Sequence, residues 1–328
     1  MSSGPEAKRR VVVATHGHCF DGAASAALFG RLLQHLEGAA TLEFGYRACG
    51  YGPGQSSLDP AWLDGELNAV LDFRYTTAPR LTWYFDHHRT AFQTPQEREH
   101  FDQHAGDGKR FHDEHYGSCS KLIADVARER FGFHDPMLDE LVRWADIIDA
   151  ARFESAEQAV MRAEPELRLM TVIEHHGDVG MLHKLVPLLG SLPLHEVTSH
   201  PEIQERWLQL APLHQNFVER VRTRSSCIGP VVFVDLTDQL TEVVGKFVTY
   251  ALFPQSAYSV VVSRARTKCK ISVGYNPWCD TPRTHDISEI CAQYGGGGHV
   301  VVGAVSLPQA AVDQARTIGM SIAQRLAT

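Results

Sequence analysis

The sequence lacks any long hydrophobic run, and cysteine is scarce. No apolar stretch approaches the roughly 20 residues that a membrane span needs. Only four apolar residues lie between the basic cluster Lys8-Arg9-Arg10 and Thr15, too few for the core of a signal peptide. The seven cysteines include no CxxC pair, which excludes a disulfide framework and argues against structural zinc. We therefore expect a cytoplasmic protein without membrane contact.

Positive charge is also limited. Lys and Arg number 31 against 39 acidic residues, giving a net charge of -8. A protein that binds long nucleic acid needs a basic track to displace counterions, so long nucleic acid is not an expected partner. A short oligonucleotide or small nucleotide remains compatible, because a metal site and a few arginines can bind it. With 328 residues, the chain is long enough for about two domains.

One stretch combines a strand with a cluster of reactive side chains. Residues 81–85 are β-prone and largely apolar, and Asp86, His87, His88 and Arg89 follow at once. In open α/β sheets, ligands bind beyond the carboxyl ends of the strands. A solvated turn with two histidines is the alternative, so companion motifs must decide.

Two other apolar runs end in the same way. Residues 11–14 lead to His16, His18, Cys19 and Asp21, and residues 69–71 lead to Asp72. Three strands that each finish on His or Asp can converge on one metal site. Between and beyond these motifs we expect a helix over 23–33, a plain connection over 45–54 and a mobile surface loop over 94–115.

Helices dominate the middle of the chain. Ser118 is the expected N-cap and Gly132 the expected stop of one helix, and a second runs from 137 to 149. Asp146 and Asp149 share one face of the second helix. Two carboxylates on such an apolar helix are costly unless paired or metal-bound, although a solvated face is the alternative. Residues 155–199 are expected to be helical, and 201–222 to form a connecting helix.

The last third predicts a second α/β unit that ends in a glycine block. We expect strands at 231–234, 258–263 and 269–274, and a helix over 242–252. Gly295 to Gly298 precede His299 and an apolar segment. Consecutive glycines let backbone N–H groups approach an anion, and a histidine adds a donor to phosphate. A flexible tail would also explain four glycines, but not their place between a helix and a strand.

Asp86-His87-His88 together with the distant Gly-Gly-Gly-His block resembles the DHH/DHHA1 phosphoesterase superfamily over nearly the whole chain. The resemblance implies an α/β fold with an N-terminal parallel-sheet DHH domain at 1–198. It further implies a helical linker at 199–224 and a smaller α/β DHHA1 domain at 225–328, with the active site in the interdomain cleft. It is compatible with a homodimer.

The resemblance also implies a hydrolytic site with two divalent ions, usually Mn²⁺, with Mg²⁺, Fe²⁺ or Zn²⁺ as alternatives. Asp86 and His88 would be catalytic. The metal ligands would come from His16, His18, Asp21, Asp72, His87 and either Asp146, the first choice, or Asp149. The substrate would be bound by Ser118, Arg264 or Arg266, Gly296, Gly297, Gly298 and His299.

The first motif departs from the usual family form of one histidine followed by two aspartates. Here Cys19 stands two residues before Asp21, and the spacing from His16 is one residue short. The motif instead resembles a less common branch with a His-x-x-Cys-x-Asp-Gly pattern. His18 or Cys19 would then supply the missing ligand, and either would shift the preference from manganese towards iron or zinc.

The leading function implied by the resemblance is that of the nano-RNase, or oligoribonuclease-like, branch. Such an enzyme releases nucleoside monophosphates from short oligonucleotides with a hydroxide activated by two metals. Hydrolysis of a cyclic dinucleotide, of 3'-phosphoadenosine phosphate or of polyphosphate are the alternatives. Tyr275 or Trp278 would favour a nucleotide if either stacks on a base, although core packing is as good an explanation. A nucleotide-binding regulator on a degenerate scaffold is the alternative of another class.

Overall fold

The computed structural model describes residues 8–50, 58–241, 245 and 247–328. The chain divides into two compact units, each with its own sheet. The first unit comprises Met1–Arg152 and Glu164–Trp207, and the second comprises Phe153–Ala163 and Leu208–Thr328. None of the helices within these described residues is long and apolar enough to cross a membrane.

The first unit is built on a five-stranded parallel sheet. Its order is β2-β1-β3-β4-β5, and every neighbouring pair is parallel. Both faces of such a sheet are covered by other elements, which explains why β3 is buried along its whole length. The strands are β1 (Arg9–His16), β2 (Leu42–Cys49), β3 (Leu67–Leu71), β4 (Trp83–Asp86) and β5 (Arg110–His112).

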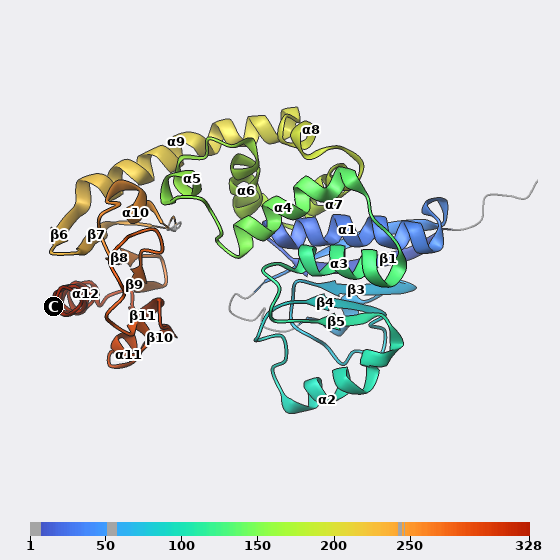
Figure 1. Cartoon of the computed structure of the whole chain (residues 1–328), viewed down its shortest axis with the longest axis horizontal. Coiled ribbons are helices and arrows are strands. Elements are labelled where there is room, and N and C mark those ends of the chain that lie inside the picture. The colour runs from blue at the N-terminus through green and yellow to red at the C-terminus, as the bar shows by residue number, and fades with distance from the viewer. Residues whose placement is uncertain (1–7, 51–57, 242–244, 246) are drawn as a thin grey trace, which may run out of the picture. The chain divides into compact units, whose positions relative to one another are not determined.

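Helices cover both faces of this sheet, with α1 and α3 on one side and α2 on the other (Figure 1). On the first face, Phe29 of α1 packs against Trp83 with ring centroids 5.7 Å apart. On the second, Phe101 of α2 lies 6.1 Å from Tyr84, the next residue of the same strand. The helices are α1 (Phe20–Glu37), α2 (Pro95–His104), α3 (Cys119–Phe131), α4 (Asp139–Asp149), α6 (Pro165–His176), α7 (Val179–Ser191), α8 (Leu194–Thr198) and the start of α9 (Pro201–Arg224).

Two of the predicted connections in this unit are wrong. Part of the expected connection at 45–54 is strand β2, and residues 51–57 lie outside the described residues. The expected loop at 94–115 contains α2 and β5. The sequence signal for α2 is its capping box, in which Thr94 and Glu97 satisfy each other's backbone N–H groups. Its composition hides the helix, since Phe101 alone is buried.

The second unit contains a six-stranded mixed sheet in the order β10-β11-β9-β8-β7-β6. β7 and β8 are parallel, and the other pairs are antiparallel. The α/β class predicted for both units is therefore confirmed. The strands are β6 (Ser225–Ile228), β7 (Val231–Leu240), β8 (Tyr258–Arg264), β9 (Lys268–Tyr275), β10 (Gly297–His299) and β11 (Val302–Pro308).

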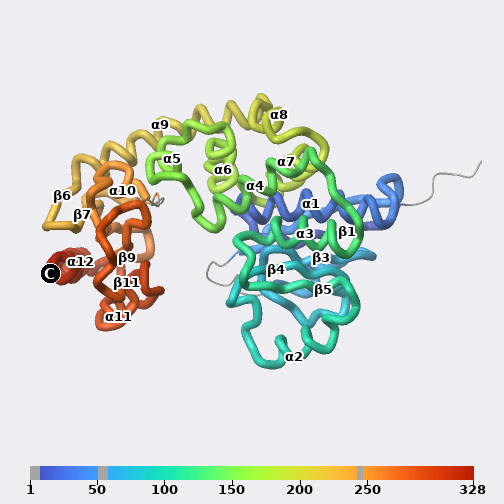
Figure 2. The backbone as a smooth tube through the Cα atoms, viewed as in Figure 1, coloured from blue at the N-terminus to red at the C-terminus, as the bar shows by residue number. Residues whose placement is uncertain are grey.

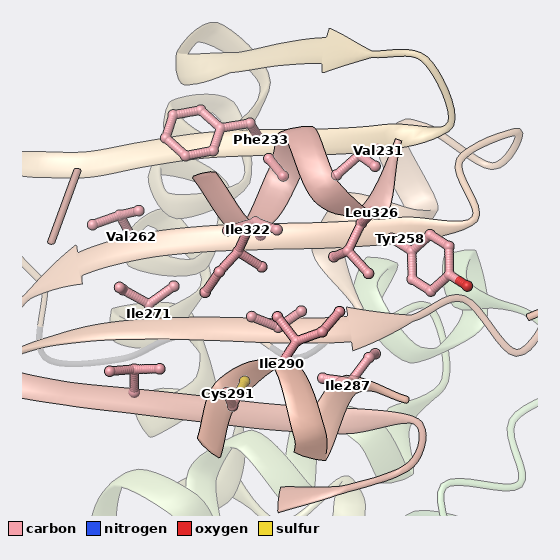
Figure 3. Packing of buried hydrophobic residues seen from close by; sticks show 14 of the residues in the cluster. Val231, Phe233, Tyr258, Val262, Ile271, Ile287, Ile290, Cys291, Ile322 and Leu326 are labelled. Carbon is pink, nitrogen blue, oxygen red and sulfur yellow. The ribbon is translucent and has the colours of Figure 1, made fainter. Parts of the chain in front are cut away.

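Helices α11 (Ile287–Ala292) and α12 (Val312–Leu326) pack on one face of this sheet. Figure 3 shows Ile322 and Leu326 of α12, and Ile287 and Ile290 of α11, above the strands. Helices α5 (Ala156–Met161) and α10 (Val248–Leu252) and the part of α9 from Leu208 onward also belong to this unit. The strands expected at 231–234, 258–263 and 269–274 are confirmed. The expected helix at 242–252 is observed at α10, and residues 242–244 and 246 lie outside the described residues.

Candidate functional site

Three neighbouring strands of the first unit end on His or Asp. β1 ends at His16, Asp72 follows β3 directly, and β4 ends at Asp86 ahead of His87. β3 and β2 pair with opposite sides of β1, so the strand order reverses at this point. Such a switch point leaves a crevice at the carboxyl ends of the strands, where ligands bind in open α/β sheets.

Asp72 is the centre of this cluster. It is fully buried, and its backbone adopts a left-handed φ of 53°, which a non-glycine residue rarely does. Neither carboxylate oxygen makes a hydrogen bond. Its Oδ1 lies 3.6 Å from His87 Nε2 and its Oδ2 lies 3.6 Å from His16 Nδ1. A buried carboxylate without hydrogen bonds is costly, so the position suits a bound cation.

His87 faces three carboxylates. Its Nδ1 lies 3.1 Å from the carbonyl oxygen of Tyr116, which orients the ring. The opposite nitrogen, Nε2, is buried without a hydrogen bond and lies 3.2 Å from Asp149 Oδ2 and 4.0 Å from Asp21 Oδ2. Burial would lower the pKa of His87, but Asp149 and Asp72 raise it to about 11. The carboxylates thus create a strong demand for positive charge at this nitrogen.

Asp86 holds the second histidine. The buried carboxylate accepts hydrogen bonds from the Tyr84 hydroxyl at 3.1 Å and from the backbone N–H of His87 at 2.9 Å. Its Oδ1 lies 2.7 Å from His88 Nδ1. The oxygens of Asp86 are therefore engaged within the protein. In this geometry Asp86 holds the His88 ring in place, and its catalytic role stays a prediction.

The geometry distinguishes between Asp146 and Asp149, which the sequence left open. Asp149 groups with Asp21 and His87, with one potential ligand atom from each residue within 4.8 Å of the others. Asp146 instead accepts a hydrogen bond from Arg152 at 2.6 Å. It also accepts one from Ser118. The cluster therefore favours Asp149, against the first choice made from the sequence.

Ser118 has a structural position. Its side chain is fully buried, caps α3 by accepting the backbone N–H of Lys121 at 3.2 Å, and donates to Asp146. In this structure Ser118 therefore has a capping role, and its contact with a substrate stays a prediction.

Asp21 and Cys19 take part in the cluster, whereas His18 does not. The Asp21 carboxylate accepts the backbone N–H groups of Cys119 at 2.7 Å and Ser120 at 3.0 Å. Cys19 groups with His16 and Asp72 within 4.8 Å. His18 Nδ1 lies 3.1 Å from the carbonyl oxygen of Glu174. Of the two candidates for the missing first-motif ligand, the geometry favours Cys19.

The donor set fits two cations. Three overlapping groups of potential ligands occur among the described residues; Asp72 belongs to the first two of them and His87 to the last two. Two cations could therefore be held with Asp72 between them. The groups are His16, Cys19 and Asp72; Asp72, His87 and His88; and Asp21, His87 and Asp149.

The glycine block of the second unit forms a β-hairpin. β10 pairs with β11, and His299 lies opposite Val302. The register continues to Gly274 of β9 and Ser259 of β8, which places the hairpin at one end of the sheet. His299 is exposed.

The predicted grouping of Arg264 and Arg266 with this hairpin is not observed within the sheet. Arg264 pairs with Cys269, five residues along β9 from Gly274. At about 3.3 Å per residue, the backbone of Cys269, opposite Arg264, lies roughly 17 Å along β9 from Gly274, which pairs with the hairpin. Arg266 lies beyond Arg264, in the turn between β8 and β9. The sequence alone does not give the length of β9, and this length determines how far Arg264 lies from the hairpin.

Comparison with known structures supports the fold. No protein-family model matches the sequence, and no curated protein matches it. The structure is similar to a pGpG-specific phosphodiesterase, PggH, from Vibrio cholerae, with a TM-score of 0.67 and 19% identity over 97% of this chain and 99% of that chain. The chain has the DHH fold.

Two further structures share this DHH fold. The DHH domain of a member of the s1p family of ribosomal proteins has a TM-score of 0.61 and 12% identity, over 98% of this chain and 88% of that chain. RecJ from Thermus thermophilus, in complex with Mn²⁺, has a TM-score of 0.57 and 14% identity. This match covers 97% of the present chain and 52% of RecJ. The resemblance predicted from the sequence is thereby confirmed at the level of the fold.

Proposed function

We propose that the chain is a metal-dependent phosphodiesterase that hydrolyses short oligonucleotides to nucleoside monophosphates. The observation that carries the proposal is Asp72, whose buried carboxylate has no hydrogen bond and lies between His16 and His87. Buried carboxylates are normally satisfied by hydrogen bonds, so one without them indicates a position for a further partner. Two cations bridged by Asp72 would provide that partner.

The chemistry of the donors supports divalent ions as the cofactors. Carboxylates and imidazoles suit Mn²⁺ and Mg²⁺, and the thiol of Cys19 adds affinity for Fe²⁺ or Zn²⁺. Ions held here would lower the pKa of a bound water and neutralise phosphate oxygens. RecJ, a structural neighbour, is described in complexes with Mn²⁺ and with Mg²⁺.

The chain's own residues arrange the reacting groups. Tyr116 fixes His87 through its carbonyl oxygen, and Asp86 fixes His88 through its carboxylate. His88 Nδ1 lies 3.7 Å from Asp72 Oδ1, so its ring stands beside the proposed ion sites. A ring held there can donate to a phosphate oxygen as negative charge develops during the reaction.

The substrate class rests on charge and on the names of the neighbours. The net charge of -8 disfavours long nucleic acid, whereas a compact anion needs only a few cationic groups. One neighbour is named as a pGpG-specific phosphodiesterase and another as the exonuclease RecJ. A linear dinucleotide is therefore the first substrate to test. A cyclic dinucleotide, 3'-phosphoadenosine phosphate and polyphosphate are the alternatives.

The test is hydrolysis by purified protein with Mn²⁺, run in parallel on linear dinucleotides, a cyclic dinucleotide, 3'-phosphoadenosine phosphate and polyphosphate. We expect turnover of a linear dinucleotide to its monophosphates, and its loss in Asp72→Ala, which removes the bridging carboxylate. Turnover that persists in Asp72→Ala would contradict the two-metal site. Nucleotide binding without turnover on any substrate would instead favour a regulator on a degenerate scaffold.

A further inference from the structure

The two arginines that the sequence suggested as anion-binding residues of the second unit, Arg264 and Arg266, do not lie near the glycine hairpin within the sheet. Arg264 lies at the end of the sheet remote from the glycine hairpin, as its pairing with Cys269 shows. In Figure 3, Tyr258 and Ile287 lie towards one end of the strands and Val262 towards the other. The hairpin lies at the Tyr258 end of the sheet. Ser259 of β8 pairs with Gly274 of β9, Gly274 pairs with Val302 of β11, and Val302 pairs with His299 of β10.

A second segment is bound to the hairpin at that end. The backbone N–H of Tyr275 donates to the carbonyl of Val301 at 2.9 Å. The backbone N–H of Ile287 donates to the carbonyl of Val300 at 3.1 Å. These two hydrogen bonds attach the end of β9 and the start of α11, which flank the connection, to two adjacent residues of the hairpin. Figure 2 traces this part of the chain from β9 to β11.

The connection is held in one conformation. The Tyr258 hydroxyl accepts the backbone N–H groups of Thr284 at 2.8 Å and His285 at 3.2 Å. The buried Asn276 side chain donates to the carbonyl of Ser256 at 2.8 Å. Such fixed hydrogen bonds pre-organise the side chains of the connection and lower the entropy cost of binding.

This connection carries the cationic groups nearest in sequence to the hairpin contact. Arg283 stands four residues before Ile287, and its Nη1 donates to the carbonyl of His285 at 2.6 Å. Among the ion pairs between described residues, none involves Arg283, His285 or His299. Asp286, the adjacent carboxylate, accepts hydrogen bonds from Ser288 as the cap of α11. The positive charge of Arg283 is thus not consumed by a salt bridge within the described chain.

The hairpin itself has two properties of a nucleotide surface. A Cβ atom added to Gly297 would meet nothing within 4 Å, so the fold does not require glycine there. Bare backbone at such a position allows close approach of a ligand. Val300, Val301 and Val302 beside His299 are 42%, 48% and 50% exposed. Apolar surface beside cationic groups matches a nucleoside with its phosphate better than it matches polyphosphate.

We propose that Arg283 and His285 bind a phosphate of the nucleotide substrate, beside the hairpin residues Gly297 and His299 that the resemblance already implies, and that Arg264 and Arg266 do not. The proposal rests on the proposed phosphodiesterase function and specifies its substrate contacts. Trp278 in the same connection is not a stacking platform, since its indole N–H donates to the Phe153 carbonyl and its ring packs 5.2 Å from Phe247.

The test compares variants at the two ends of the sheet. We expect Arg283→Gln to raise KM for a 5'-phosphorylated dinucleotide about tenfold to a hundredfold, because a charge-assisted hydrogen bond is lost. The value of kcat and the metal content should change little, since the contact is remote from the bond that is cleaved. Gln retains an N–H donor for the His285 carbonyl, and Arg283→Lys should recover most of the affinity.

Arg264→Ala and Lys268→Ala are the matched controls at the remote end and should leave KM unchanged. A rise in KM in Arg264→Ala, with none in Arg283→Gln, would overturn the proposal. Equilibrium binding of a nucleoside 5'-monophosphate to the same variants separates this proposal from the proposed function, because it needs no turnover. If the protein shows no hydrolytic activity but Arg283→Gln still weakens monophosphate binding, the proposed binding site would be supported and the proposed hydrolytic function would be contradicted.

Discussion

The carboxyl edge of the first sheet and the glycine hairpin of the second unit differ in the charge that each is built to receive. At the first, burial would raise the pKa of Asp72, but His16 and His87 lower it to about 2. Three carboxylates in turn face His87. At the second, the glycine hairpin is hydrogen-bonded to Tyr275 and Ile287, which flank the connection that carries Arg283 and His285. The comparison supports the proposal that one region binds cations and the other an anion.

The two regions also differ in how tightly the fold constrains them. Asp21, Asp72 and Asp86 are all buried, and each is placed by a strand end or a helix start. Gly297 and His299 are exposed on a three-residue edge strand. Substitutions at the strand ends should therefore have larger effects than substitutions in the hairpin.

The largest effect is expected from Asp149, compared with its neighbour Asp146 as the matched control. Asp149→Asn removes a carboxylate that faces His87 at 3.2 Å. Metal affinity should fall by more than the roughly tenfold to hundredfold lost when a residue that only orients a metal ligand is replaced. Asp146→Asn breaks only a salt bridge to the exposed Arg152, which should cost less than about 1 kcal/mol of stability. Metal analysis and thermal denaturation of both variants check this.

The reverse result, with metal lost from Asp146→Asn and retained in Asp149→Asn, would return the ligand role to the residue first favoured from the sequence. Both carboxylates follow from the same helical spacing, so the pattern could not separate them. Their difference comes from Arg152 and Ser118, which contact Asp146. These contacts depend on how α3 and α4 pack, which no local pattern reveals.

An intermediate effect is expected at Cys19, where the sequence departs from its family. Cys19→Asp replaces a soft thiol by a hard carboxylate within the group of His16 and Asp72. The preference for Mn²⁺ over Zn²⁺ should rise by about tenfold or more. Competitive metal binding at equal free concentrations measures this change directly. An unchanged preference in Cys19→Asp, with an unchanged metal content in Cys19→Ser, would remove Cys19 from the ligand set.

The sequence predicts an element correctly where a local pattern of residues marks its end or its start. The strands that end on His16, Asp72 and Asp86 are recognisable because apolar runs give way to polar ligands. The helix α3 is recognisable from its Ser118 cap and its Gly132 stop, which has a φ of 63°. Strand β2 and helix α2 escape prediction, since an edge strand is only partly buried and α2 buries a single apolar side chain.

The placement of the second unit's arginines fails for a different reason. Arg264 and the glycine block are joined by β9, the connection 276–286 and α11. Whether they meet depends on the register of three strands. Register is set by pairing between distant segments, so a sequence pattern does not determine it.

The smallest effects are expected in the hairpin, where two adjacent glycines should respond in opposite ways. Gly298 has a φ of 154°, and an added Cβ would lie 2.2 Å from the carbonyl oxygen of Val302. Gly298→Ala should therefore destabilise the second unit by about 1 to 3 kcal/mol. An added Cβ on Gly297 meets nothing within 4 Å, so Gly297→Ala should change stability by less than about 0.5 kcal/mol.

Nucleotide affinity should reverse this order if the open face of Gly297 receives the ligand. A methyl group there would block close approach and weaken monophosphate binding several-fold, because a hydrogen bond to backbone contributes about 1 kcal/mol. Thermal denaturation and equilibrium binding of both variants, measured on the same preparations, separate the two contributions. Unchanged monophosphate affinity in Gly297→Ala would mean that Gly297 is needed neither for the fold nor for ligand binding. The proposed anion region would then depend on Arg283 and the histidines alone.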